Sequence, residues 1–307
     1  MIRYVLGRIV FAIPTLLVLI VFSYVLMYAA PGSPLARERA LPQAVLDNIA
    51  ARYGLDDPLW VQVWDYIVGI VTRFDFGPSF IYRNLSVNDI IAQGFPVTLT
   101  YGGLAFLLAV AVGIPLGVAA AVRHNSWLDY LAVGFTVGAQ VLPNFVMAPI
   151  LVLIFTVWLG WLPAGGWNGG APENLVLPVI ALATSFMASI ARLTRSSMLE
   201  VLNQGFVRTA RAKGLPTRKV ILRHALKPAL LPVISYLGPT FVGMITGSVV
   251  IDYFFSTGGM GQFLVNAALN RDYAVMMGLT ILTGALTIGF NLLVDVAYAW
   301  IDPRIRY

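Results

Sequence analysis

The chain has 307 residues, of which 59% are hydrophobic and only 11% are charged. Its mean hydropathy is +0.81, and a soluble protein of this length would need far more charge to cover its surface. Cysteine is absent, which excludes disulfides and thiolate metal sites. The composition therefore predicts an integral membrane protein.

Long uncharged runs give the number of membrane spans. A spanning helix needs about 20 consecutive apolar residues. Trimmed at their Pro, Gly and Asn clusters, the runs predict spans at about 9–30, 97–122, 130–159, 174–191, 229–251 and 273–294. The first run is too long for the apolar region of a signal peptide, and Pro143 and Pro149 predict a kink in the third. We expect an all-α integral membrane protein with six transmembrane helices.

The positive charges predict the orientation. Of the 20 Lys and Arg, 14 lie at the two termini and in the loops 123–129 and 192–227. Because cytoplasmic loops are enriched in Lys and Arg, we expect both termini in the cytoplasm. The segment after the first span then forms a small external cap, with helical patterns at 41–53 and 58–71. The predicted division is a cytoplasmic N-terminus with the first transmembrane helix at 1–30, an external cap at 31–96, and a five-helix transmembrane core at 97–307 that contains a cytoplasmic loop at 192–228.

The loop 192–227 has an internal order that its nine Lys and Arg do not explain. One stripe of a predicted helix over 199–214 is apolar; it comprises Leu199, Leu202, Phe206 and Ala210. Gly214 would end this helix in a left-handed conformation, and Pro216 would open a second helix. Such an elbow can be held by a partner protein, although a loop resting on anionic lipid is the simpler interpretation.

At these residues the sequence resembles a known family. The run Arg208-Thr-Ala-Arg-Ala-Lys-Gly214, followed by His224-Ala-Leu-Lys-Pro228, is similar to the cytoplasmic loop motif of ATP-binding-cassette importer permeases. Ala210, Gly214 and Leu226 match that motif, whereas Arg208, Thr209 and His224 depart from it as in the peptide-transporting branch. Further similarity covers essentially the whole chain, and the segments 161–163 and 165–170 resemble the B-type permease subunit of bacterial oligopeptide importers.

The resemblance implies a coupling helix that sits in a groove of a cytoplasmic ATPase. The implied coupling residues are Leu199, Leu202, Phe206, Arg208, Thr209, Ala210, Gly214 and Leu215. The implied partners are a second homologous permease subunit, two cytoplasmic ATPase subunits, an extracytoplasmic peptide-binding protein, the peptide substrate and membrane lipid. The implied location is the bacterial inner membrane, and ATP would be used by the partner subunits.

The sequence offers little for chemistry of its own. The phosphate-loop motif G-x4-G-K-[ST] is missing, as are H-E-x-x-H and G-x-S-x-G, so we expect no catalytic residue, metal site or cofactor in this chain. An intramembrane hydrolase is disfavoured for the same reason. Since most of the net charge of +6 lies in one loop, we expect no nucleic-acid partner. His124 and His224 lie in predicted loops and are expected to be solvated.

Polar and small residues within the spans allow two interpretations. Candidates for lining a path are Gln140, Asn144, Thr246, Ser248 and Asn291, although hydrogen bonds between helices explain them as well. The glycine pairs 113/117, 134/138 and 243/247 permit close helix packing, although glycine is common in membrane helices and composition alone explains each pair equally well. No Asp, Glu, Lys or Arg is expected deep within a span, which favours an external energy source. The alternatives are a self-sufficient channel or secondary carrier, or a related importer of dipeptides, glutathione or nickel.

Overall fold

The computed structural model describes residues 2–29, 57–79, 81–82, 85–246 and 248–301. Within these ranges the secondary structure is helical apart from an isolated bridge between Pro78 and Ser86. The helix predicted at 41–53 lies outside the described residues. The helix predicted over 58–71 is confirmed as α3, Leu59–Arg73, while its place in an external cap stays a prediction.

Five helical runs are long and apolar enough to cross a membrane. Three of them are the single helices α1 (Ile2–Ala29), α4 (Val87–Val122) and α7 (Pro172–Leu202). The fourth, 217–254, joins α9 (Thr217–Lys219), the π-helix η3 (Val220–Ala225), α10 (Leu226–Thr246) and α11 (Val249–Phe254). The fifth lies in α13 (Tyr273–Ile301). The helices α4 and α7 extend beyond the predicted spans because hydropathy marks the apolar part of a helix, not its ends.

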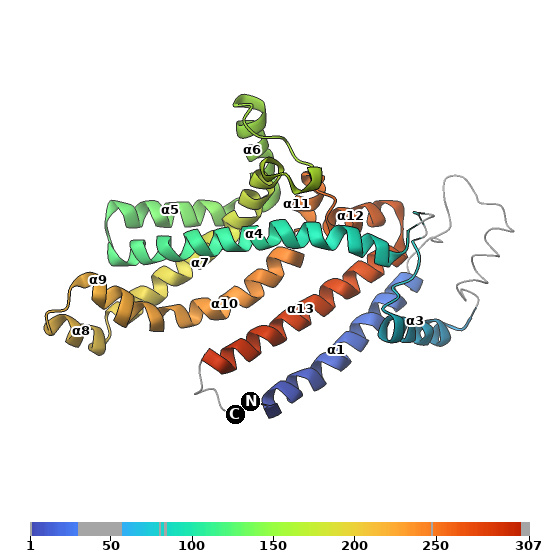
Figure 1. Cartoon of the computed structure of the whole chain (residues 1–307), viewed down its shortest axis with the longest axis horizontal. Helices are drawn as coiled ribbons and strands as arrows, with labels where there is room; N and C mark the ends of the chain where they lie inside the picture. Colours follow the sequence, from blue (N-terminus) through green and yellow to red (C-terminus); the bar gives the residue numbers. More distant parts are fainter. Residues whose placement is uncertain (1, 30–56, 80, 83–84, 247, 302–307) are drawn as a thin grey trace. The chain divides into compact units, whose positions relative to one another are not determined.

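The predicted third span is broken rather than straight. Helix α5 (Trp127–Val141) is followed by α6 (Asn144–Leu151) and the π-helix η1 (Val152–Trp158), and the two parts meet at an angle of 105°. Pro143 causes the break, since it lacks an N–H and its ring clashes with the preceding turn. Figure 1 shows α6 leaving the direction of α5. The structure therefore has six spans only if this bent pair counts as one.

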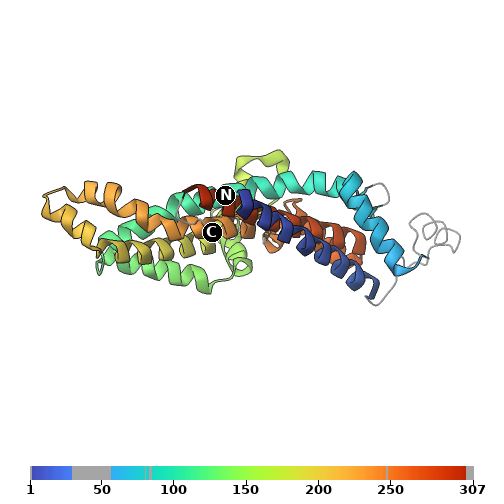
Figure 2. The same ribbon diagram turned by 90° about the horizontal axis from the view of Figure 1, so that it is seen from below.

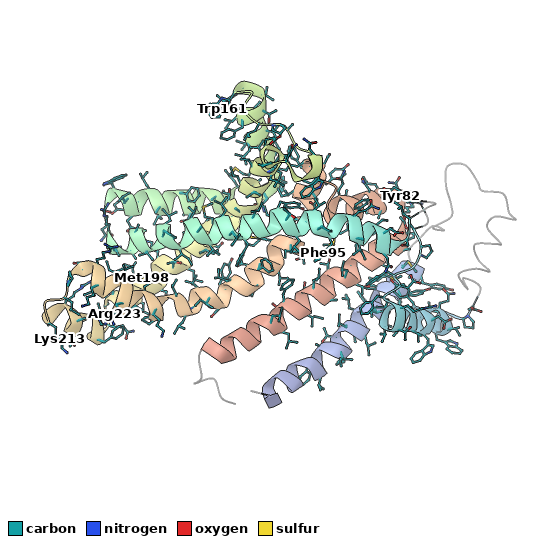
Figure 3. All side chains as sticks on the ribbon, viewed as in Figure 1. Tyr82, Phe95, Trp161, Met198, Lys213 and Arg223 are labelled. Carbon is teal, nitrogen blue, oxygen red and sulfur yellow. The ribbon has the colours of Figure 1, made fainter. Side chains whose placement is uncertain are left out.

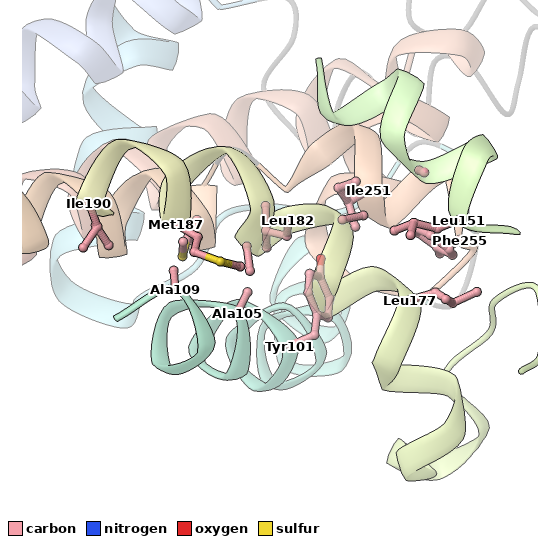
Figure 4. Close-up of a cluster of buried hydrophobic side chains, with 14 of the residues drawn as sticks. Tyr101, Ala105, Ala109, Leu151, Leu177, Leu182, Met187, Ile190, Ile251 and Phe255 are labelled. Carbon is pink, nitrogen blue, oxygen red and sulfur yellow. The ribbon is translucent and has the colours of Figure 1, made fainter. Parts of the chain in front are cut away.

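The chain forms two compact units, and the larger comprises Val97–Thr257. Its core surrounds α7, on which α5, α6 and α10 pack. Figure 4 shows Tyr101, Leu182 and Met187 among the buried side chains. A Cβ on Gly113 would lie 2.9 Å from the carbonyl oxygen of Met187, and one on Gly117 would lie closer still to that of Ala191. The predicted packing role of this glycine pair is therefore confirmed at the contact of α4 with α7.

The other predicted glycine pairs differ from this one. A Cβ on Gly134 or Gly138 would meet nothing within 4 Å among the described residues. At Gly243 it would make only ordinary contact with Phe186, at 3.5 Å, and residue 247 is outside the described part. Gly134, Gly138 and Gly243 thus mark no tight helix crossing among the residues that the structure describes.

The second unit comprises Met1–Pro96 and Gly258–Tyr307. In it α1 packs along α13, while α12 (Met260–Asn270) packs on α13 and α3 packs on α1. The fully buried Asp272 accepts a hydrogen bond from the Ser79 hydroxyl and a second, of 3.2 Å, from the Ile81 N–H. These bonds fix the segment before α4 to the turn between α12 and α13. The predicted division at residues 30 and 96 follows membrane topology and stays a prediction.

Candidate functional site

The elbow is a real feature of the structure, but its first helix is shorter than predicted. Helix α7 ends at Leu202, and α8 covers Gly205–Ala212. The single helix predicted over 199–214 is therefore wrong. The break is at Gln204, whose extended backbone (ψ 152°) precedes Gly205. Asn and Gly are poor helix formers, so the run Asn203-Gln-Gly205 carried a signal that the apolar stripe obscured.

At the C-terminal end of α8 the structure agrees with the turn predicted from the sequence. Gly214 has φ +75°, and its N–H donates to the carbonyl oxygen of Arg211 at 2.9 Å. This is the predicted left-handed residue after the helix. Pro216 then caps α9, which begins at Thr217. Figures 1 and 2 show α8 and α9 together at one end of the helices α7 and α10.

Most of the predicted apolar stripe faces the chain's own core. Ala210 is buried there beside Val207, Met198 and Val220. Partly buried against the same cluster are Leu199, Leu202 and Leu215. Val207 is fully buried, and the sequence reading missed it although it lies three residues before Ala210. The predicted stripe thus mainly attaches the elbow to the larger unit.

The exposed face of α8 is small and cationic. Phe206 is 47% exposed, and Arg208 and Thr209 are exposed as well. We call these three exposed residues of α8 the elbow face, although Arg208 lies about 200° around the helix from Phe206. Further exposed cations lie along the same loop, namely Arg211, Lys213, Arg218, Lys219, Arg223 and Lys227. Figure 3 places Lys213 at the tip of the elbow and Met198 further inside.

A buried ion pair supports the helix that leads into the elbow. Asp129, at the start of α5, is 2% exposed and accepts two hydrogen bonds from the Arg195 guanidinium on α7, one of them 2.8 Å long. The backbone N–H of Asn125 and the Nδ1 atom of His124 lie 3.0 and 3.1 Å from the same carboxylate. His124 is therefore half-exposed but engaged, not simply solvated as predicted. His224 lies in η3 and is partly buried.

The polar candidates for a path mainly connect helices or bond within them. The amide of Gln140 donates to the Ser189 hydroxyl at 3.1 Å, and the Asn144 side chain accepts from the Ser185 hydroxyl at 2.7 Å. Both bonds join the broken span to α7. Thr246 and Ser248 donate to backbone carbonyls of their own segment, and Asn291 is exposed.

Asp252 is a buried ionisable residue that the sequence reading left aside. It lies in α11, inside the run 217–254, and is fully buried. The hydroxyl of Thr257 donates to its carboxylate at 2.7 Å, and that of Ser248 at 3.2 Å. Asp252 lies two residues before the end of that run, so the expectation of no charge deep within a span stays a prediction. Among the described residues, no group of three His, Asp or Glu could hold a metal ion.

Comparison with known proteins identifies the family. Residues 113–307 match the model for binding-protein-dependent transport system inner membrane components, and residues 1–102 match the model for the N-terminal part of these components. The chain belongs to this family. The predicted resemblance and the all-α membrane fold are thereby confirmed.

Individual relatives of this permease match over its full length. The oligopeptide transport system permease proteins OppB of Salmonella typhimurium LT2 and Escherichia coli K12 are 55% identical, with all of both chains covered. The dipeptide transport system permease protein DppB of Bacillus subtilis is 46% identical over the whole chain and 98% of its own length. A solved inward-facing structure of the methionine ABC transporter MetNI covers 69% of this chain and 96% of its own, with a TM-score of 0.60 and 17% identity. It shows the same fold.

Proposed function

We propose that this permease is one membrane subunit of an ATP-driven importer of oligopeptides. The observation that carries the proposal is the 55% identity, without gaps in coverage, to permeases named for oligopeptide transport. The 46% identity to a permease named for dipeptides makes dipeptide import the second candidate. Both belong to one transport class, in which the chain forms part of the path and is not itself an enzyme.

We infer that the elbow face docks on a cytoplasmic ATPase subunit. Phe206 is a half-exposed aromatic side chain, and the exposed cations of the same loop would complement an acidic groove. Aromatic residues at the centre of an interface commonly carry much of its binding energy. In this proposal the remaining predicted coupling residues hold α8 in place, four by packing against the buried cluster and Gly214 by the turn that it forms. These are Leu199, Leu202, Ala210, Gly214 and Leu215.

The proposed assembly contains this permease, a second homologous permease, two ATPase subunits and an extracytoplasmic peptide-binding protein. The concentration of Lys and Arg in the loop 192–227 supports a cytoplasmic elbow, with both termini on the same side. ATP would bind to the partner subunits, since this sequence has no phosphate loop. The bacterial inner membrane is the location that agrees with the family description.

For the path we propose the polar side chains that border α7. Gln140 and Asn144 already meet serines of α7, and helices that hydrogen-bond in this way can exchange partners with a passing peptide backbone. Thr246, Ser248 and Asn291 complete the proposed set. Their side chains are uncharged, so peptides of either charge would pass without a strong electrostatic preference.

The test is replacement of the relative in Escherichia coli K12. The full chain is expressed in a strain that lacks its own OppB, and uptake of labelled dipeptides and of tri- to pentapeptides is measured. We expect restored uptake of the longer peptides, together with co-purification of ATPase subunits. Restored uptake of dipeptides alone would favour the second candidate. A chain that assembles with ATPase subunits but restores no peptide uptake would overturn the proposal.

A further inference from the structure

Helix α3 carries an apolar surface that packs on no other helix among the residues that the structure describes. Trp60, Trp64 and Val71 are between 64% and 74% exposed. At 100° per residue they fall within an arc of about 40° on one side of the helix. Phe74, at the end of the helix, is also 74% exposed. We call these four residues the aromatic strip.

The remaining sides of α3 either pack on α1 or carry polar residues. One side packs on α1 through Leu59, Val63, Tyr66 and Ile70. The polar side carries the exposed residues Asp65 and Thr72, which lie seven positions apart in nearly the same direction. The exposed Arg73 widens this side at the C-terminal end of the helix. The rest of the circumference of α3 is mainly apolar.

The contact with α1 gives the depth of α3 along the membrane normal. The Tyr24 hydroxyl donates to the Gln62 side chain at 3.0 Å, and the rings of Tyr24 and Tyr66 lie 5.5 Å apart. Tyr24 is five residues before Ala29, where the apolar span of α1 ends. Five residues of helix rise about 8 Å. Figures 1 and 2 show α3 crossing α1 near this end.

We propose that the aromatic strip is a lipid-binding surface, and that α3 lies in the leaflet in which α1 ends at Ala29. Amphipathic interfacial helices place their apolar face about 5–10 Å below the headgroup boundary, which is the depth that Tyr24 gives. Tryptophan concentrates at the same level of membrane proteins. In the stretch of α1 that meets α3, exposed apolar side chains include Val21 and Val25, as a helix in contact with lipid requires.

Burial of apolar surface, not charge, drives this binding. The only cation of α3 is Arg73, while Asp65 is acidic. Zwitterionic lipid is therefore sufficient, and high salt should leave the position of the helix unchanged. The proposal needs only the membrane-spanning fold and is independent of the transported substrate.

Because the chain has no cysteine, the full-length protein is a ready background for site-specific labels. Two matched pairs are made, Trp64→Cys with Asp65→Cys and Val71→Cys with Thr72→Cys, so that each pair compares adjacent positions on the two sides of α3. Each variant carries an environment-sensitive fluorophore and is reconstituted in phosphatidylethanolamine–phosphatidylcholine vesicles. Quenching is measured with aqueous iodide and with lipid spin-labelled near the headgroup.

We expect labels at 64 and 71 to emit at shorter wavelength, to be quenched at least threefold more by the spin-labelled lipid than labels at 65 and 72, and to resist iodide. Iodide access at all four positions would place α3 in water and overturn the proposal. Protection of 64 and 71 from both quenchers would mean a protein covers the strip, which also overturns it. If one variant fails to insert, the other pair gives the same comparison.

Discussion

Helices α3 and α8 are both short and amphipathic, and both leave aromatic side chains exposed, yet they do so in different ways. On α3 two tryptophans, Val71 and Phe74 form a continuous apolar strip with little positive charge nearby. On α8 a single aromatic, Phe206, is half-exposed, in a loop whose other exposed residues include many cations. The first surface suits the lipid interface, and the second suits a protein groove with a few strong contacts.

The difference teaches that an amphipathic pattern does not define its own partner. The exposed residues described above distinguish the two helices, and so do the buried residues that attach each helix to the rest of its unit. The inner side of α3 rests on α1 through large side chains, whereas α8 attaches through the small residues Val207 and Ala210. Because only these small side chains anchor α8, its position depends also on the segments that connect it, α7 before it and the turn at Gly214 after it.

Removing the Asp129 carboxylate, which pairs with Arg195 of α7, should have the largest effect on stability. It tests how firmly the helix that leads into α8 is held. Asp129→Ala leaves the Arg195 guanidinium partly buried without its carboxylate, which commonly costs about 3 kcal/mol. We expect a clear drop in the thermal unfolding temperature of the purified protein. Arg192→Ala, which removes an exposed cation from the same helix, is the control. Equal stability of the two variants would show that the pair does not secure α7.

Changing the turn after α8 should have the next largest effect. At φ +75° a β-branched residue is strained by up to about 3 kcal/mol, so Gly214→Val should misplace α8 and reduce ATPase co-purification and transport. A Cβ there would meet no atom within 4 Å among the described residues, so the effect comes from the backbone alone. Gly214→Asn is the control, because asparagine tolerates this conformation. Normal docking of the valine variant would contradict the proposed elbow.

Phe206→Ala tests the elbow face directly. A central aromatic anchor commonly contributes about 2 kcal/mol, so ATPase binding should weaken about 30-fold. The folding stability of the isolated permease should change little, since Phe206 is already half-exposed. Val207→Ala gives the opposite pattern, with stability lost from the buried cluster. If both variants lose stability equally and keep the ATPase, Phe206 is a core residue and not an anchor.

Arg208→Ala should have the smallest effect. The side chain is exposed, and single exposed charges usually change stability by less than about 0.5 kcal/mol. We expect nearly normal ATPase binding at equilibrium but slower association at low salt. Stopped-flow association at two salt concentrations measures this. A large loss at equilibrium would move Arg208 to the centre of the interface.

The sequence predicted best those features that depend on adjacent residues. The left-handed Gly214, the cap at Pro216 and the break at Pro143 each follow from the backbone chemistry of one residue. The prediction of one helix over 199–214 was wrong at Gln204, because a turn there interrupts residues whose spacing matched a single apolar stripe. Hydrophobic periodicity reports which residues share a face, but it does not report whether the helix is continuous.

Contacts between distant segments were beyond sequence reasoning. The ion pair of Asp129 with Arg195 joins residues 66 positions apart, and nothing near either residue indicates the other. The same holds for Asp272 with Ser79. The proposed elbow face was predicted only in part, because the burial of Leu199 and Leu202 is decided by α10 and η3 packing against them.

The continuity of α7 has a mechanical consequence. Its 31 residues form a rod about 47 Å long, secured near one end by Arg195 and at the other by the Asn174 side chain, which donates to the Gly165 carbonyl at 2.6 Å. A small tilt of a helix this long displaces its end considerably: a tilt of about 5° moves the far end of α7 by about 4 Å. That displacement approaches the width of an extended peptide backbone. A permease built on this rod would need only a slight rotation at α8 to open or close its distant end.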